Sequence, residues 1–128
     1  MTMTKEKIQL EFTLNTSPKL LYTRISTPSG LSEWFADNVQ LNGKNFTFFW
    51  DDSEQVAKLL MKKANEYVRF QWEDDEGEEA FFEFRIAKDE LTGDVALIIT
   101  DFVEADEIED TTDLWGSQVN ELRRAIGL

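Results

Sequence analysis

Large aromatic side chains alternate with polar residues along three segments in the middle of the chain. Phe46, Phe48 and Trp50 occupy every second position of one segment, and the same alternation recurs in residues 67–72 and 82–86. A period of two places the aromatic rings on one face of a β-strand and the polar side chains on the other. Because a sheet with one apolar face must be covered by another layer, the chain is limited to folds in which another element packs over this aromatic face.

The other extended segments complete an antiparallel sheet of about six strands. Residues 8–14 alternate cleanly and form the first predicted strand, and residues 55–63 and 95–104 form two more. Short turns join successive strands of the middle region, so these strands are expected to pair as antiparallel neighbours. Residues 37–45, which include an Asn-Gly pair, are expected only to return the chain to extended structure.

Two short helices are predicted after the first strand. Ser17 with Pro18, and Thr27 with Pro28, each combine an N-cap residue with a proline at the first helical position. Leu31, Trp34 and Phe35 are expected to form the apolar stripe of the second helix.

A long helix is predicted at the C-terminus. Acidic residues crowd its start, two arginines lie near its end, and Gly127 stops it. It is the only predicted element long enough to cover the sheet, so residues 1–128 are expected to form a single α+β domain. The residues of its helical stripe, which recur at steps of three and four, are Ile108, Thr111, Trp115, Val119, Leu122 and Ile126.

The charge of the chain excludes several partners. It has 26 Asp and Glu residues against 13 Lys and Arg residues, which gives a formal net charge of -13. Such a charge repels phosphate backbones and anionic lipid headgroups, so we expect binding neither to nucleic acid nor to a membrane. A monomer or a weak homodimer is the expected state.

Histidine and cysteine are both absent from the sequence. Their absence removes disulfides, thiol catalysis, thiolate metal sites and imidazole chemistry. We therefore predict no catalytic residue, no metal ligand and no cofactor. Residues 1–7 are polar and no apolar run could cross a bilayer, so a cytoplasmic location is expected.

Three motifs resemble those of a known superfamily. Residues 27–35 are similar to the second-helix motif of the heat-shock chaperone ATPase activators, residues 46–50 to their first meander strand, and residues 114–122 to the start of their C-terminal helix. With the element order, these motifs resemble the helix-grip fold of the START-like superfamily, which also includes polyketide cyclases. The chain looks closest to small bacterial START-like domain proteins without an assigned activity. The resemblance implies a curved antiparallel sheet with a long C-terminal helix packed across it.

The aromatic face of the sheet and the apolar stripe of the last helix should meet in the interior. A cavity there would suit a small hydrophobic ligand, either a lipid or an aromatic metabolite, whereas a closed core would use the same rings to fill space. The small size of the chain favours the closed core, and the need of buried indole N–H groups for acceptors favours a cavity. The candidate ligand-binding residues are Trp34, Phe35, Phe48, Trp50, Phe70, Trp72, Phe82, Phe84, Trp115, Val119 and Leu122.

Asp101 interrupts an otherwise apolar strand. A catalytic role in the cavity would require a partner acid, base or metal ligand, and the sequence offers none in a recognisable arrangement. We therefore interpret Asp101 as a solvent-facing residue on the outer side of the sheet, paired with a lysine or arginine of a neighbouring strand. The acidic residues 73–79 lack the ligand order of a calcium loop and are interpreted as a solvated hairpin tip.

Three functions of different classes follow from these features. The first is a non-catalytic domain that binds a small hydrophobic ligand between the sheet and the C-terminal helix. The second is a protein-interaction module, similar to the chaperone activators, that uses its acidic surface on a basic patch of a partner protein. The third is a cyclase-like enzyme, which ranks last because the remaining chemical groups form no recognisable constellation.

Overall fold

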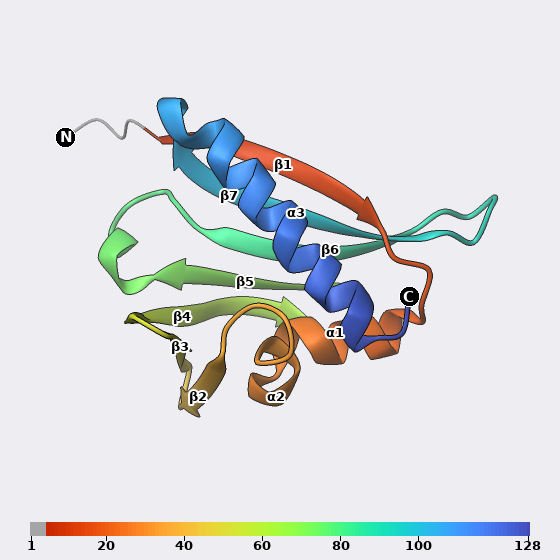
Figure 1. Ribbon diagram of the computed structural model, residues 1–128, viewed down its shortest axis with the longest axis horizontal. Helices are drawn as coiled ribbons and strands as arrows, with labels where there is room; N and C mark the ends of the chain where they lie inside the picture. The colour runs from red at the N-terminus through yellow and green to blue at the C-terminus, as the bar shows by residue number, and fades with distance from the viewer. Residues whose placement is uncertain (1–4) are drawn as a thin grey trace.

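The computed structural model describes residues 5–128. Residues 1–4, part of the polar stretch in which no targeting signal is expected, lie outside the described residues. Seven strands form one curved antiparallel sheet, and a long helix crosses its concave face (Figure 1). The strands are β1 (Lys5–Thr13), β2 (Asn38–Asn42), β3 (Asn45–Trp50), β4 (Ser53–Lys63), β5 (Tyr67–Trp72), β6 (Phe82–Lys88) and β7 (Val95–Glu104). The helices are α1 (Pro18–Ser26), α2 (Pro28–Leu31) and α3 (Ile108–Ala125), with single 3-10 turns at η1 (Glu73–Asp75) and η2 (Ala105–Glu107).

The strand order is β1-β7-β6-β5-β4-β3-β2, with every pair of neighbours antiparallel. Strands β3 to β7 therefore form the expected meander, and the edge strands β1 and β2 extend it by pairing with β7 and β3. The α+β class and the covered antiparallel sheet are confirmed.

The sheet has one strand more than the alternation predicts. The extra strand, β2, forms a hairpin with β3 in which Asn42 lies opposite Asn45 and Gly43 has a φ of +64°. Glycine at the first position of a two-residue hairpin loop allows such a turn. The alternation did not predict β2 because, of its two apolar residues, only Val39 is buried, whereas Leu41 is 48% exposed.

The two short helices begin where the capping signals predict. The Ser17 hydroxyl accepts a hydrogen bond from the backbone N–H of Leu20 at 3.1 Å, and the Thr27 hydroxyl accepts one from Gly30 at 3.0 Å. Each bond satisfies a backbone donor that the first helical turn leaves unpaired. Both helix starts are therefore fixed locally.

The second helix is shorter than expected. It ends at Leu31, so Trp34 and Phe35 lie in the turn that follows it. The helix approaches α1 closely at Gly30, where an added Cβ would lie 2.1 Å from the backbone oxygen of Thr23. The turn after this contact carries Trp34 and Phe35 into the core, where both are buried.

The C-terminal helix covers the concave face, as the sequence predicts. Trp115, Val119 and Leu122 on α3 are buried against the core, and the chain turns after the helix at Gly127, whose φ is +80°. Figure 1 shows α3 running obliquely from the β1 and β7 side of the sheet toward α1. Among the described residues, no helix combines the length and apolar character needed to cross a bilayer.

Candidate functional site

Most of the candidate ligand-binding residues fill the interior. Their side chains are packed between the sheet, the turn after α2 and the middle of α3, and few of their atoms reach solvent. The buried members of the set are Trp34, Phe35, Phe48, Phe70, Phe82, Phe84, Trp115, Val119 and Leu122. The two remaining members, Trp50 and Trp72, are partly buried and pack against this core from its edge.

Phe35 lies at the centre of the aromatic cluster. Its ring stacks on Trp115, with centroids 5.7 Å apart and an angle of 12° between the planes. It meets Phe48 edge-on at 5.0 Å and Trp50 at 5.8 Å. Edge-on and stacked contacts of this kind stabilise aromatic cores beyond the burial of their area. Phe35 therefore separates the filled interior from the space beside Trp50.

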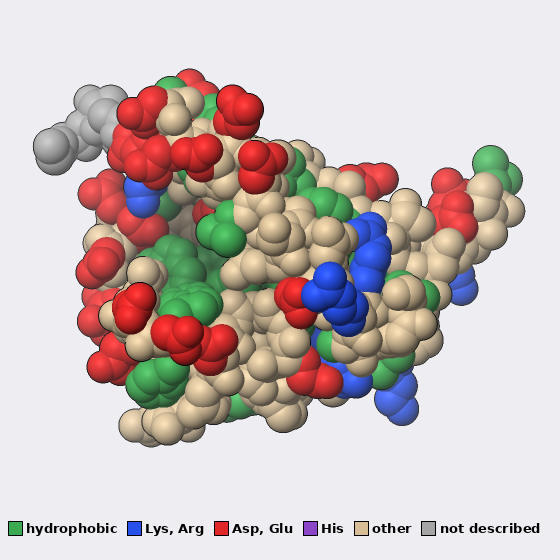
Figure 2. Space-filling model, viewed as in Figure 1, with side chains coloured by type: hydrophobic (Ala, Val, Ile, Leu, Met, Phe, Trp, Pro, Cys, Tyr) green, Lys and Arg blue, Asp and Glu red, His purple; other side chains and the backbone are tan. Residues whose placement is uncertain are grey.

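That space is an open pocket of about 380 Å³ between the N-terminal half of α3 and strands β3 to β5. Figure 2 shows it as a hollow with an apolar floor. Three of the four tryptophans of the chain contribute to its wall. The lining residues are Phe35, Trp50, Ser53, Gln55, Trp72, Asp101, Thr111, Leu114, Trp115 and Gln118. Of the predicted site residues, Phe35, Trp50, Trp72 and Trp115 line this pocket.

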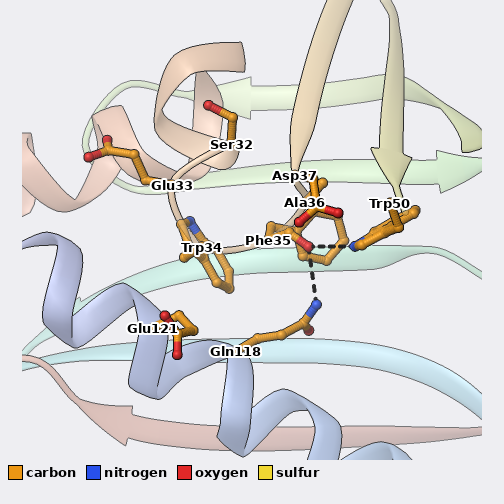
Figure 3. A pocket seen from close by; sticks show the side chains of 9 residues that line it. All are labelled: Ser32, Glu33, Trp34, Phe35, Ala36, Asp37, Trp50, Gln118 and Glu121. Carbon is orange, nitrogen blue, oxygen red and sulfur yellow. Dashed lines mark hydrogen bonds between the residues drawn. The ribbon is translucent and has the colours of Figure 1, made fainter. Parts of the chain in front are cut away.

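The Phe35 carbonyl ties the walls of this pocket together. It accepts hydrogen bonds from Trp50 Nε1 at 3.0 Å and from Gln118 Nε2 at 3.2 Å (Figure 3). These bonds connect the turn after α2 with β3 and with α3. Because both donors also line the pocket, their side chains are held in place without a ligand.

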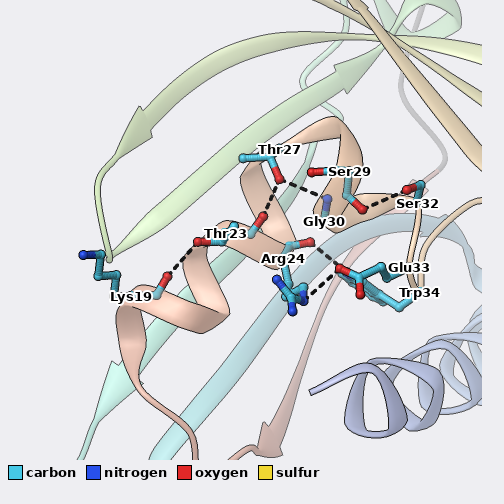
Figure 4. Close-up of polar contacts among 9 residues, drawn as sticks. All are labelled: Lys19, Thr23, Arg24, Thr27, Ser29, Gly30, Ser32, Glu33 and Trp34. Carbon is cyan, nitrogen blue, oxygen red and sulfur yellow. Dashed lines mark hydrogen bonds and ion pairs between the residues drawn. The ribbon is translucent and has the colours of Figure 1, made fainter. Parts of the chain in front are cut away.

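A second pocket, of about 440 Å³, lies on the other side of Phe35 beside α2 and α3 (Figure 3). Its wall is more polar and includes the carboxylates of Glu33, Asp37 and Glu121. Trp34 closes its inner end, and its indole N–H donates to the Arg24 carbonyl at 2.8 Å (Figure 4). Because polar and acidic side chains make up much of its wall, this second pocket offers a ligand less apolar surface than the first.

Asp101 lies on the concave face, which corrects the interpretation of this residue as solvent-facing on the outer side. It follows Leu97 and Ile99 on the same face of β7, since alternate residues of a strand share a face. Trp115 Nε1 donates to Asp101 Oδ2 at 3.0 Å, and the backbone N–H of Phe102 donates to Oδ1 at 2.8 Å. The need of the Trp115 N–H for an acceptor was the sequence signal that could have placed Asp101 inside.

Burial raises the pKa of the Asp101 carboxyl above its ordinary value, because desolvation disfavours the charged form. The hydrogen bonds from Trp115 and Phe102 and the charge of Lys5 act in the opposite direction, and the charge of Asp75 adds to the rise in pKa. Lys5 is itself paired with Asp75, with Nζ and Oδ1 3.1 Å apart. Across residues 5–128, no basic side chain forms an ion pair with Asp101.

Acidic side chains gather around the mouth of the pocket (Figure 2). Glu54, Glu73 and Asp74 line a neighbouring hollow that shares Gln55 and Trp72 with it. The first turn of α3 adds further carboxylates on the opposite side. Within residues 5–128, these acids form no cluster of three or more that could hold a metal ion. The rim is therefore a diffuse negative surface around an apolar floor.

A curved antiparallel sheet that grips a C-terminal helix, with a pocket between them, defines a helix-grip domain. A family model described as a START-like superfamily domain matches residues 2–128, so the chain belongs to the START-like superfamily. The resemblance proposed from the sequence is confirmed. No curated protein matches the chain.

Solved structures agree with this assignment. The Bacteroides fragilis protein BfR322, solved by solution NMR, is 48% identical, with a TM-score of 0.68 over 98% of this chain and 94% of that chain. The Aha1 dimer from Colwellia psychrerythraea is 17% identical, with a TM-score of 0.78 over 94% of this chain and 95% of that chain. DynU16, from the dynemicin biosynthetic locus, is 12% identical, with a TM-score of 0.78 over 94% of this chain and 47% of that chain. The last two similarities concern the fold alone.

Proposed function

We propose that this protein is a non-catalytic binding domain for a small hydrophobic molecule, held in the pocket beneath the N-terminal half of α3. The observation that carries the proposal is the partial exposure of Trp50 and Trp72 in the wall of a pocket of about 380 Å³. Pockets of roughly 300–1,000 Å³ with aromatic walls and few polar groups are typical of ligand sites. The pocket lies near the lower end of this range.

The size of the pocket favours a compact ligand. Phe35 closes its inner end, and Phe48, Phe70 and Phe84 behind it are fully buried. A long acyl chain would have to displace these rings, which are packed at the density of a protein core. Of the two ligand classes considered, an aromatic metabolite therefore fits better than a lipid.

Titration with the neutral fluorescent probe N-phenyl-1-naphthylamine tests this proposal. In a 15N-labelled sample, the indole N–H signals of Trp50, Trp72 and Trp115 are expected to shift on binding. The signal of Trp34, which points to the Arg24 carbonyl and does not line the pocket, serves as an internal reference. Absence of saturable binding, or shifts confined to Trp34, would contradict the proposal.

A pocket-filling variant gives a second test. Thr111→Phe places a ring at the pocket wall, and Asn120→Phe places the same ring on an exposed position of α3 that does not line the pocket. Thr111→Phe is expected to weaken probe binding by roughly tenfold or more, because it competes for the same apolar surface. Asn120→Phe is expected to bind as the parent protein does. Equal binding by both variants would mean that the probe binds elsewhere.

A protein-interaction role is the second candidate, and the acidic rim favours it. A net charge of -13 and the carboxylates around the pocket mouth suit a partner with a basic patch. The similarity of the fold to that of Aha1 also supports a protein-interaction role. Such a complex is expected to weaken steeply between about 0.05 M and 0.5 M salt, because screening reduces attraction between exposed charges. Binding of a cytosolic partner that is insensitive to salt would contradict an electrostatic interaction.

A further inference from the structure

We propose that the pocket selects organic cations, namely ammonium compounds that carry an aromatic or short alkyl group, with the cationic group held between the tryptophan rings and Asp101. This inference rests on the proposed binding function and specifies the charge of its ligand. Three independent features of the described residues support it: the aromatic walls, the single carboxylate and the sign of the surrounding charge.

The walls supply several aromatic rings around one space. The ring centroids of Trp50 and Trp72 are 6.4 Å apart, and the ring planes are inclined by 55°. The two rings therefore form a V-shaped wall. The ring centroid of Phe35 lies 5.8 Å from that of Trp50 and 6.4 Å from that of Trp72, so Phe35 contacts both walls. Aromatic faces attract cations, and tryptophan does so most strongly. Rings grouped in this way are the usual means of binding a quaternary ammonium group.

Asp101 is the only ionisable side chain among the lining residues of the described chain. Its two oxygens accept hydrogen bonds from Trp115 and Phe102, which fix the carboxylate toward the pocket side of β7. A carboxylate oxygen can accept more than one hydrogen bond, so both oxygens keep acceptor capacity. Lys5 acts on Asp101 through its charge but forms its ion pair with Asp75. Because no basic side chain within residues 5–128 forms an ion pair with Asp101 itself, a ligand cation would be its direct ionic partner.

The surrounding charge favours the same sign of ligand. No lysine or arginine lines the pocket, and the neighbouring hollow adds Glu54, Glu73 and Asp74. Like charges around a low-dielectric cleft raise the local concentration of oppositely charged ligands and repel ligands of the same sign. A fatty acid or a phosphate ester would be repelled by the carboxylates around this mouth. The acidic surface thus excludes anionic members of the hydrophobic ligand class.

A purely structural role for Asp101 makes a different prediction. If the carboxylate served only to accept the Trp115 N–H, an asparagine would replace it without consequence for binding, because its amide oxygen is also an acceptor. The structural role and the cation-binding role therefore separate in the variant Asp101→Asn. This variant keeps the size of the side chain and one acceptor oxygen for the Trp115 N–H, and it removes the charge and the second acceptor, which receives the backbone N–H of Phe102.

Three matched probes test the inference on the intact protein at pH 7: phenethylammonium, 2-phenylethanol and phenylacetate. They share one ring and differ in charge. Phenethylammonium is expected to bind roughly tenfold more tightly than 2-phenylethanol, which corresponds to one added cation–π and carboxylate contact. Phenylacetate is expected to bind most weakly. Isothermal titration calorimetry measures the affinities, and the indole N–H signal of Trp115 reports on the contact at Asp101.

Single substitutions identify the residues that determine the selectivity for cations. Asp101→Asn is expected to lower the affinity for phenethylammonium roughly tenfold and to leave that for 2-phenylethanol unchanged. Asp113→Asn removes the same charge from an exposed position of α3 that does not line the pocket, and is expected to change neither affinity more than about twofold. Leu114 is 59% exposed at the pocket mouth, so Leu114→Lys and Leu114→Gln should both fold. The lysine variant is expected to bind phenethylammonium more weakly than the glutamine variant, because its positive charge repels the cation.

The outcomes separate this inference from the proposed function. Equal affinity for the three probes, or unchanged selectivity in Asp101→Asn, would overturn the inference and leave a neutral hydrophobic site in place. Failure of all three probes and of N-phenyl-1-naphthylamine to bind would overturn the proposed function as well. Loss of cation selectivity in both Asp101→Asn and Leu114→Lys supports the inference.

Discussion

The two ends of α3 cover the sheet in different ways. Toward its C-terminal end, Val119 and Leu122 of α3 are fully buried against the core. Toward its N-terminal end, Leu114 is 59% exposed, and the face beside it carries the pocket lined by Trp50 and Trp72. The same helix therefore seals one end of the fold and leaves the other end accessible. The sealed end supplies stability, and the open end is available for binding.

The difference arises from the oblique path of α3. The helix starts on the β1 and β7 side of the sheet and ends near α1 (Figure 1). At that end, α1 and the turn after α2 also cover the sheet, with Leu21, Ile25 and Leu31 fully buried. Among the elements of residues 5–128, no comparable one covers β3 to β5 beside the start of α3 (Figure 1). A single helix cannot cover both ends of a wide curved sheet, so aromatic surface remains exposed where it crosses only one edge.

Trp115 lies at the boundary between the two ends, and its removal is expected to have the largest effect. Trp115→Ala should lower the free energy of unfolding by about 3–5 kcal/mol, because it opens a cavity under α3 and removes the donor to Asp101. Urea denaturation followed by circular dichroism measures this loss. A loss of less than about 1 kcal/mol would mean that α3 contributes little to covering the sheet.

Alanine substitutions at two leucines compare the two ends of α3 directly. Leu122→Ala is expected to cost about 2–5 kcal/mol of stability, because the side chain is fully buried. Leu114→Ala, on the same helix, is expected to cost less than about 0.5 kcal/mol, because more than half of that side chain is already exposed. The pair controls for helix propensity, since the substitution is the same. Similar losses at both positions would contradict the division into a sealed and an open end.

Asp101 gives the smallest expected effect, which appears as a dependence on pH. Its pKa is raised in the folded protein, so the unfolded chain loses this proton first and the folded state binds more protons between the two pKa values. The parent protein should therefore lose stability relative to Asp101→Asn as the pH rises. The loss in its free energy of unfolding begins near the ordinary pKa of an aspartate and ends above the raised pKa of the folded state. Above the raised pKa, the difference in free energy of unfolding between the two proteins should stay constant.

Urea midpoints at a series of pH values from about 3 to about 7 measure this difference. Other carboxylates titrate in both proteins and largely cancel in the comparison. Lys5 and Asp75 are the charged groups that act on Asp101, so Asp75→Asn should lower the pKa of Asp101 and narrow the pH range of the effect. A difference that grows in favour of the parent protein with rising pH would contradict a raised pKa.

The sequence was sufficient to predict most of the fold because its signals are periodic. The alternation around Phe48 and Phe70 predicts a one-sided sheet, and the stripe through Trp115, Val119 and Leu122 predicts the helix that covers it. Local capping at Ser17 and Thr27 placed the short helices. By contrast, β2 is short and polar, so its pairing depends on β3 and leaves little periodic signal.

The site was harder to predict than the fold. Alternation places Trp50 and Trp72 on the aromatic face, but whether they are covered depends on the path of α3, which no local pattern specifies. Asp101 was misplaced because a charged residue in an apolar strand suggests the outer face. Its actual position depends on the N–H of Trp115, which is distant in sequence and meets Asp101 only when α3 packs on β7.

A crystal structure of the protein with phenethylammonium tests the central claim most directly. The account predicts the phenyl ring against Trp50 and Trp72, with the ammonium nitrogen within hydrogen-bonding distance, about 2.7–3.2 Å, of an Asp101 oxygen. Asp101→Asn crystals treated in the same way should lose this density. A probe bound at another surface, or a pocket closed by the collapse of Leu114 onto Trp72, would contradict the claim that this end of the concave face is an open binding site.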